Sequence, residues 1–199
     1  MKGKIFSKIE GGKYKGKKLS LPPLSTTRST KSIVKNSFFD TVQFEITDKI
    51  FFEVFAGSGS MGLEAISRGA KFSFFIEKDK EAFKILSKNI SLIDSKSSKA
   101  YLGDSFSLYE IVLKEIESLK NRAYIYFDPP FDIREGMEGI YEKTFSLIEK
   151  TPKNLVQMIV LEHLSKIDIP DRIGEFEKIK SRKFGKTTLS YFQGIKEER

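Results

Sequence analysis

Apolar runs and amphipathic segments alternate along the chain from Ile50 onward, and this alternation limits the fold more than any other sequence feature. We expect strands at 50–55, 72–77, 99–104, 123–128 and 157–163. We expect helices between them at 60–70, 80–93, 106–119 and 139–150. Strands that are apolar throughout and separated by helices indicate a parallel sheet with helices on both faces. The tail predicts a last pair of strands around Gly185 and Lys186, one of them antiparallel, which makes a mostly parallel, seven-stranded α/β sheet.

The first part of the chain has a different pattern. Two short strands are expected around a turn at Gly11 and Gly12, followed by a helix that begins near Thr30. The 199 residues fit one domain with a small appendage. We therefore predict an N-terminal extension at 1–45 and an α/β domain at 46–199.

Composition excludes several classes of site. The chain has no cysteine and one histidine, His163, so disulfides, thiolate metal sites and zinc hydrolysis are excluded, and no metal is expected. We expect His163 to be a structural, hydrogen-bonded residue. No run approaches 18 apolar residues and the N-terminus has no apolar signal region, so we expect a cytoplasmic protein without membrane contact. A domain of this kind can act alone, and we expect a monomer.

The positive charge is concentrated at the N-terminus. Of the net charge of +8, residues 1–36 hold ten basic residues and one acid, whereas the remainder holds 25 basic and 26 acidic residues. A concentrated basic segment favours binding of a polyanion such as nucleic acid, although a solvated basic face has the same composition.

A glycine motif stands between the first strand and the first helix of the α/β part. Gly57, Gly59 and Gly62 form the pattern G-x-G-x-x-G, which lets the backbone approach a ligand at a helix N-terminus. Glu77 ends the next strand, where a carboxylate can accept hydrogen bonds from the ribose of a nucleotide-like ligand. At this point a dinucleotide dehydrogenase fits equally well.

Three features count against a dehydrogenase. Glu53 lies inside the first strand, where a carboxylate would crowd a pyrophosphate but suits an ammonium group. Gly103 and Asp104 end the third strand, and the fourth ends in "DPPF", Asp128 to Phe131. The carboxyl ends of parallel strands converge on one crevice, so we expect these acids to lie together.

These motifs resemble the S-adenosylmethionine-dependent amino-methyltransferases, in which "DPPF" matches the D/N-P-P-Y/F signature. With "GGKYKGKKL", "RSTKSIVKNSFFD", "IVLEH" and "KFGKTTLSYF", nearly the whole chain is similar to the RsmD family of 16S ribosomal RNA guanine-N2 methyltransferases. The resemblance implies a Rossmann-like class I methyltransferase fold, S-adenosyl-L-methionine as cofactor and small-subunit ribosomal RNA as partner, free or in a partly assembled particle. Two departures from the family are Ser29, where proline is usual, and Ser32 and Asn36, where acids are common.

The resemblance also implies residue roles. The amine acceptors would be Asp128 and the carbonyl of Pro129, with Pro130 stiffening the corner and Phe131 stacking on an extruded base. The cofactor set would be Thr30, Glu53, Phe55, Gly57, Ser58, Gly59, Gly62, Glu77, Lys78, Asp104, Ser105 and Phe106. Contacts to RNA phosphates would come from Lys13, Lys15, Lys17, Lys18, Arg28, Lys31 and Lys35.

Three rival functions stay open at this stage. A DNA adenine-N6 or cytosine-N4 methyltransferase shares the same corner, although about 70 residues after the fourth strand leave no room for a DNA-recognition domain. A non-catalytic ribosomal RNA-binding or assembly factor would keep the crevice without needing "DPPF". A nicotinamide dehydrogenase is the third.

Overall fold

The computed structural model describes residues 6–22, 28–130 and 139–196. Its first half contains β1 (Phe6–Lys8), β2 (Lys18–Ser20), α1 (Arg28–Val42), the 3-10 helix η1 (Gln43–Ile46), β3 (Ile50–Glu53), α2 (Ser60–Ser67), β4 (Phe72–Glu77), α3 (Lys80–Ile93) and β5 (Ser98–Leu102). Its second half contains α4 (Ser105–Ser118), β6 (Ala123–Phe127), α5 (Ile140–Glu149), the 3-10 helix η2 (Lys153–Leu155), β7 (Val156–Leu164), β8 (Arg172–Ile173), β9 (Phe176–Phe184) and β10 (Thr187–Gly194).

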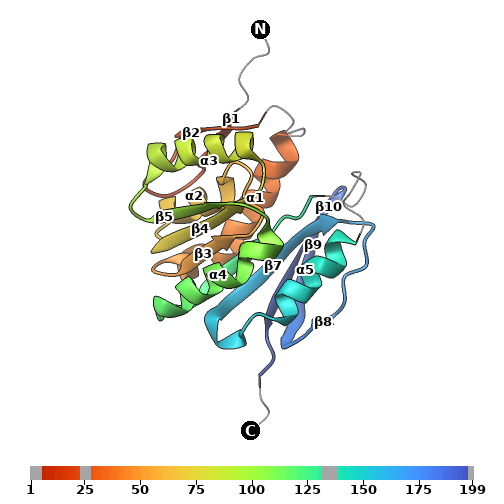
Figure 1. Ribbon diagram of the computed structural model, residues 1–199. Coiled ribbons are helices and arrows are strands. Elements are labelled where there is room, and N and C mark those ends of the chain that lie inside the picture. The colour runs from red at the N-terminus through yellow and green to blue at the C-terminus, as the bar shows by residue number, and fades with distance from the viewer. Residues whose placement is uncertain (1–5, 23–27, 131–138, 197–199) are drawn as a thin grey trace.

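One large sheet organises the molecule (Figure 1). Its strand order is β5-β4-β3-β6-β7-β10-β9-β8. The first five of these are mutually parallel, whereas β10 is antiparallel to both β7 and β9. The parallel α/β prediction is confirmed. The strand count was wrong, because the described chain adds β8, whose two residues are too short to leave an apolar run in the sequence.

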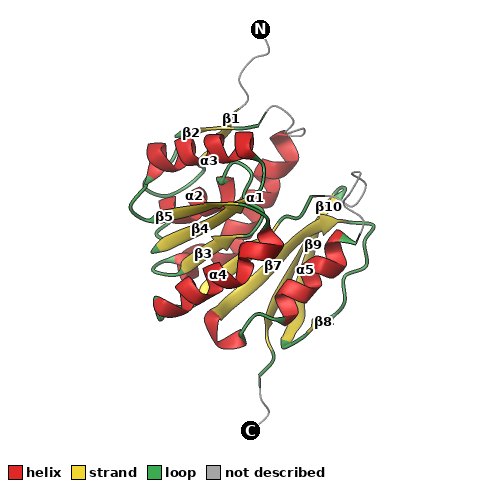
Figure 2. Cartoon of the chain, in the orientation of Figure 1, coloured by secondary structure: helices red, strands yellow, loops and turns green. Residues whose placement is uncertain are grey.

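Helices cover both faces of the sheet (Figure 2). Successive strand side chains point to opposite faces, so Phe51 and Tyr126 enter the core beneath α1, α2 and α3, while Phe52 and Phe127 enter the core beneath α4 and α5. Burial on both faces explains why these strands are apolar throughout. In the described part of the chain, no helix is both long enough and apolar enough to cross a membrane.

The N-terminal strands pack on the sheet's α1–α3 face. Ile9 and Leu19 are buried in the same cluster as Phe39 of α1. The expected turn is a longer loop, and Gly12 (φ +75°) lies so close to α2 that an added Cβ would stand 1.8 Å from the carbonyl oxygen of Ser67. These glycines therefore serve close packing against a helix end. The division of the chain at residue 45 stays a prediction.

Two buried polar side chains fasten this extension. The Glu64 carboxylate, on α2, accepts hydrogen bonds from the backbone N–H groups of Glu10 and Gly11, each at 2.8 Å. The side-chain amide of Asn89, on α3, donates to the carbonyl oxygens of Ser20 and Ser58 and accepts from Ser20 N–H. Asn89 thus joins β2 to the glycine loop between β3 and α2.

Candidate functional site

A carboxylate stands at or near the carboxyl end of each of the five parallel strands. Glu53 and Glu77 end β3 and β4, Asp104 follows β5, Asp128 follows β6 and Glu162 lies near the end of β7. Parallel strands bring these ends to one edge of the sheet. That edge includes the switch point between β3 and β6, where crossovers leave in opposite directions. The acids expected from the sequence therefore lie along one edge.

The three motif glycines have different tasks. Gly57 has φ +54°, and a Cβ added there would meet nothing within 4 Å, so its side of the loop faces open space. At Gly59 an added Cβ would lie 2.5 Å from Leu86, and at Gly62 it would lie 2.3 Å from Phe75. Gly59 and Gly62 are needed for helix packing, whereas Gly57 leaves room for a ligand.

Glu53 holds the start of α2. Its side chain is only 4% exposed, and its Oε2 accepts a hydrogen bond from Gly62 N–H at 2.9 Å. A carboxylate is stabilised at a helix N-terminus by the exposed N–H groups and the helix dipole. An added Cβ at Gly62 would lie 3.3 Å from this oxygen, so glycine also keeps the carboxylate close to the helix.

Glu77 holds the glycine loop from the neighbouring strand. Its Oε2 accepts from Gly57 N–H at 2.6 Å and its Oε1 accepts from Asp79 N–H at 2.7 Å. Burial raises the pKa of this carboxyl group, although these backbone hydrogen bonds oppose the shift. A partly desolvated carboxylate beside an open glycine is suited to accept hydrogen bonds from ligand hydroxyl groups.

Asp104 caps α4 at the next strand end. Its Oδ1 accepts from Phe106 N–H at 3.0 Å, and its Oδ2 lies 3.2 Å from the ammonium of Lys78. Ser105 is buried and donates to the carbonyl oxygen of Val54 at 2.6 Å. Because Asp104 already has two partners, an adenine amine would share or displace one of them.

Two aromatic rings accompany this capping carboxylate. The rings of Phe55 and Phe106 meet edge to face with their centroids 5.8 Å apart. Phe55, which the resemblance places beside the methionine part of the cofactor, follows β3, and Phe106, which it places beside the adenine, lies in the first turn of α4, so two members of the expected cofactor set come together here. Aromatic walls of this kind suit a flat heterocyclic ligand.

Asp128 stands at the corner that ends β6. Its side chain is half-buried, and the following Pro129 is buried. Phe131, the last residue of the motif, lies outside the described residues, as do the side chains of Thr30, Arg28 and Lys31. The predicted roles of those four residues stay predictions.

A tyrosine–glutamate pair beside this corner was not predicted from the sequence. The Tyr126 hydroxyl donates to Glu162 Oε2 at 2.6 Å, and both side chains are buried. Burial, followed by the charges of Glu162, Asp128 and Glu53, raises the pKa of Tyr126 well above its ordinary value. Tyr126 is therefore a protonated donor among three carboxylates. The available signal was strand alternation, which puts 126, 128, 160 and 162 on one face.

His163 has a structural role, as expected. Its ring nitrogens lie 2.9 Å from Ser190 Oγ and 3.0 Å from the carbonyl oxygen of Leu164. Burial lowers its pKa, so the imidazole is held neutral inside the sheet.

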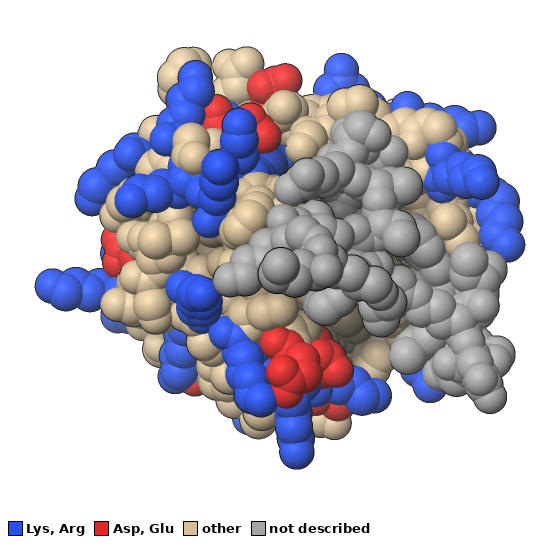
Figure 3. All heavy atoms as spheres, turned by 90° about the horizontal axis from the view of Figure 1, so that it is seen from above, with Lys and Arg blue, Asp and Glu red and all other residues tan. Residues whose placement is uncertain are grey.

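The basic residues of the extension divide into two groups. Lys13, Lys15, Lys17 and Lys18 are exposed, and basic side chains gather on the face of the molecule that carries this extension (Figure 3). The prediction for Lys35 was wrong. Lys35 is 3% exposed, and its ammonium donates to the carbonyl oxygen of Lys8 and lies 3.2 Å from Glu64. The Lys35 ammonium is engaged in a buried ion pair and is not available to bind an RNA phosphate. Among the residues described, no cluster of three metal-binding side chains occurs.

Comparison with known proteins gives concordant results. A family model described as "Conserved hypothetical protein 95" matches residues 7–193. "Ribosomal RNA small subunit methyltransferase D" of Haemophilus influenzae is 33% identical over 139 residues, covering 70% of each chain. "Putative rRNA methyltransferase YlbH" of Bacillus subtilis is 24% identical over 189 residues, covering 94% of this chain and 98% of YlbH.

Solved structures share the fold. The structure titled "Putative methyltransferase yhhF from Escherichia coli" superposes with a TM-score of 0.71 at 25% identity, covering 95% of this chain and 98% of the other. An RNA methyltransferase from Salinibacter ruber in complex with S-adenosyl-L-homocysteine has a TM-score of 0.56 at 15% identity, covering 88% and 96%. The family model covers nearly the whole sequence, so this chain belongs to the family described as conserved hypothetical protein 95, together with relatives named as ribosomal RNA methyltransferases.

Proposed function

We propose that the protein is an S-adenosylmethionine-dependent methyltransferase that methylates the exocyclic N2 amine of a guanine in 16S ribosomal RNA. The observation that carries this proposal is the shared edge of the sheet at which Glu53, Glu77 and Asp128 lie, where Glu77 holds the glycine loop and Gly57 faces open space. Relatives named as small-subunit ribosomal RNA methyltransferases, at about 30% identity, support the choice of substrate.

The set of hydrogen-bond acceptors at this edge fits S-adenosylmethionine. The ligand carries an ammonium group, two ribose hydroxyl groups and an adenine amine, all of which donate hydrogen bonds. The residues along the edge offer acceptors, namely Glu53, Glu77 and Asp104, and the open space at Gly57 admits the ligand beside the loop. Phe106 would lie beside the adenine, and Phe55, in contact with it, beside the methionine part. When bound, the cofactor supplies a methyl group attached to a sulfonium.

The catalytic task of the protein is to present an amine to that methyl group. The lone pair of a guanine N2 amine is delocalised into the ring, so the nitrogen is a weak nucleophile. Hydrogen bonds from its two protons to Asp128 and to the carbonyl of Pro129 would turn the lone pair toward the methyl carbon. Correct orientation at close distance is the main contribution to such a displacement.

Fixed charge supplies the second contribution. Positive charge develops on the amine nitrogen as the N–C bond forms, and Asp128 would stabilise it from a position held by a proline corner. The Tyr126–Glu162 pair and Glu53 surround the same region with negative charge and one neutral donor. As the N–C bond forms the S–CH3 bond would break, S-adenosylhomocysteine would leave, and the proton released from the methylated amine would pass to Asp128 or to water.

Methyl transfer to ribosomal RNA from cells lacking this protein tests the proposal. Purified protein should transfer tritiated methyl from S-adenosylmethionine to small-subunit RNA or particles from the deletion strain, and not to RNA from the parent strain. Digestion and mass spectrometry should find N2-methylguanosine as the product. Transfer to DNA alone would identify a DNA methyltransferase instead, and tight RNA binding without transfer would identify an assembly factor.

A further inference from the structure

The outer edge of the sheet carries basic residues that the N-terminal charge pattern does not include. From Lys178 to Lys186 the sequence holds five basic residues and no acid. Strand β9 pairs with β10 along its length, but its other edge pairs with β8 only at Phe176 and Glu177. Within the described residues, the strand from Ile179 to Phe184 is therefore an open edge.

Four of the five basic side chains at this edge are exposed, although Arg182 donates a hydrogen bond to Ser37 and the Lys180 ammonium lies 5.7 Å from the centroid of the Tyr191 ring. Lys178 is committed, because its ammonium lies 2.8 Å from Asp171 and donates to the carbonyl oxygen of Ile169 at 2.7 Å. The others are exposed and form no ion pair with any residue that the structure describes. These four, Lys180, Arg182, Lys183 and Lys186, are called the β9 basic edge.

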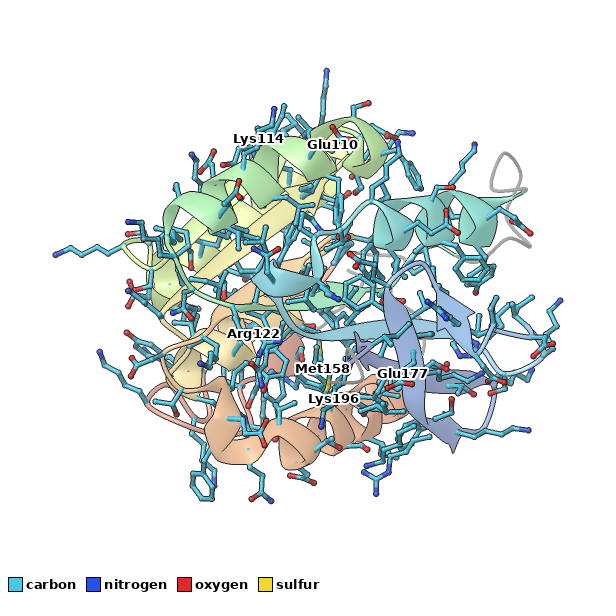
Figure 4. The ribbon with its side chains drawn as sticks, turned by 90° about the horizontal axis from the view of Figure 1, so that it is seen from below. Glu110, Lys114, Arg122, Met158, Glu177 and Lys196 are labelled. Atoms are coloured by element: carbon cyan, nitrogen blue, oxygen red, sulfur yellow. The ribbon has the colours of Figure 1, made fainter. Side chains whose placement is uncertain are left out.

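The positive charge on β9 lies toward the end of the strand that is nearer to the reaction site, and the acid Glu177 lies at its start. Glu177, at the start of the strand, lies on the side of the molecule seen from below (Figure 4). β9 runs parallel to β7, and the turn after it meets the end of β7, where Ser165 N–H donates to the carbonyl oxygen of Lys186 at 2.8 Å. Since β7 is also parallel to β6, this turn lies at the side of the sheet where the parallel strands have their carboxyl ends, and Asp128 lies at that same side.

Helix α1 lies between the β9 basic edge and the basic N-terminal extension. Lys35 of α1 reaches the carbonyl oxygen of Lys8 on β1, while Ser37 of α1 accepts a hydrogen bond from Arg182 Nη1 at 2.8 Å. Residues two apart on a helix point about 200° apart, so the two contacts lie on opposite sides of α1, and a helix is about 10–12 Å across. One RNA molecule can therefore contact both basic elements.

Edge protection is the alternative explanation for these lysines. Charged residues on an open strand prevent edge-to-edge association of sheets. Lysine is common in this role, but protection does not require that the charge lie toward the catalytic end of the strand. The absence of acids from Lys178 to Lys186 and the position of Lys186 near the reaction site favour a ligand with repeated negative charge.

We infer that the β9 basic edge is a second phosphate-binding surface, which holds the substrate RNA on the side of α1 opposite to the N-terminal extension. This inference rests on the proposed RNA methyltransferase function. The RNA would be held at two places with the target base between them. Such contacts position the RNA through its backbone and do not select the base.

A matched pair of triple variants tests the inference. The test variant is Lys180→Ala with Lys183→Ala and Lys186→Ala, which leaves the Arg182–Ser37 contact intact. The control is Lys114→Ala with Lys143→Ala and Lys150→Ala, three exposed lysines that lie in α4, in the first turn of α5 and just after α5, on the other face of the sheet (Figure 4 labels Lys114). Both variants lose three charges, so a general effect of net charge is the same in each.

Binding to unmodified small-subunit ribosomal RNA is measured over a range of salt concentrations. Each lost contact to single-stranded RNA lowers the slope of log K against log salt by about 0.7, so the test variant should lose about 2. Its affinity at low salt should fall at least tenfold, while the control keeps the slope of the wild type. Melting temperatures of both variants should match the wild type.

Three results would overturn the inference. Equal salt slopes for the two variants would show that the lysines of the β9 basic edge do not contact RNA. Self-association of the test variant with unchanged RNA binding would show that these lysines protect the strand edge. Weaker binding to assembled small-subunit particles with unchanged binding to naked RNA would identify a protein partner. Failure of the wild type itself to bind and methylate ribosomal RNA would instead contradict the proposed function, so the two failures are distinguishable.

Discussion

The backbone N–H of Gly57 donates a 2.6 Å hydrogen bond to the carboxylate of Glu77, which joins the glycine loop after β3 to the end of β4. Burial raises the pKa of Glu77, so the ionised carboxylate is maintained at a cost to the folded state. Ligand hydroxyl groups that donate hydrogen bonds to Glu77 would lower its pKa again, because they stabilise the charged form of the carboxyl group. Glu77 thus links the stability of the free protein to ligand binding.

Replacing Glu77 by Gln should change the pH dependence of stability. A raised pKa means that the folded state holds the proton more tightly than the unfolded chain does, so stability is highest below the ordinary glutamate pKa and is lost as pH rises through the raised value. Gln does not titrate. The free energy of unfolding of the variant, relative to wild type, should therefore rise from pH 4 to pH 7 in denaturant titrations. Glu81→Gln, at an exposed position on α3, is the control, and a relative loss of stability with rising pH would contradict the prediction.

Replacing Asp128 by Ala should separate catalysis from cofactor binding. The carboxylate is proposed to accept a proton of the target amine, and removal of one such electrostatic group lowers kcat by about 10²–10³. Affinity for S-adenosylhomocysteine, measured by calorimetry, should stay within about twofold of wild type, since other acceptors hold that ligand. A variant with the wild-type methylation rate would show that Asp128 does not contact the amine.

Replacing three exposed lysines of the N-terminal extension should weaken RNA binding. The variant Lys13→Ala with Lys15→Ala and Lys17→Ala loses phosphate contacts, so the salt slope should decrease by about 2, at about 0.7 for each contact. The triple variant at Lys114, Lys143 and Lys150 supplies the charge-matched control. If the salt slope were the same in both variants, the lysines of the extension would not contact the RNA.

The layered sheet and the line of acids at its edge were predictable from the sequence for a physical reason. Buried parallel strands are apolar throughout, and their carboxyl ends must share one edge, so the sequence pattern alone predicts that Glu53, Glu77 and Asp128 lie at one crevice. Strand β8 was not predictable, because two residues carry no periodicity.

Pairing across the tertiary structure was also not predictable. Lys35 is one more lysine in a basic segment, and nothing local shows that the buried carboxylate of Glu64 lies within 3.2 Å of its ammonium. The Tyr126–Glu162 hydrogen bond depends likewise on the pairing of β6 with β7. These contacts join residues far apart in the sequence, and only the folded chain brings them together.

Replacing Tyr126 by Phe should affect both stability and catalysis. The change leaves the buried Glu162 carboxylate without its hydroxyl donor, and a lost hydrogen bond to a charged group costs about 1.5–3 kcal/mol. The matched control is Tyr109→Phe on the opposite face, whose hydroxyl lies 2.8 Å from the neutral Thr151 and whose loss costs about 0.5–1.5 kcal/mol. We expect kcat to fall in the first variant alone, and equal kcat values in the two would make Tyr126 a structural residue only.

Replacing Lys35 by Ala should destabilise the protein without a direct effect on RNA contacts. The change removes one of two cationic partners of the buried Glu64, whose Oε1 still lies 2.8 Å from Arg68 Nε, so the loss is close to that of one hydrogen bond between charged groups, about 1.5–3 kcal/mol. Lys15→Ala removes an exposed charge from the same basic segment and should change the free energy of unfolding by less than about 0.5 kcal/mol. At a temperature where both variants are folded, Lys15→Ala should lower the salt slope of RNA binding and Lys35→Ala should not. The reverse pattern would return Lys35 to the phosphate-binding set.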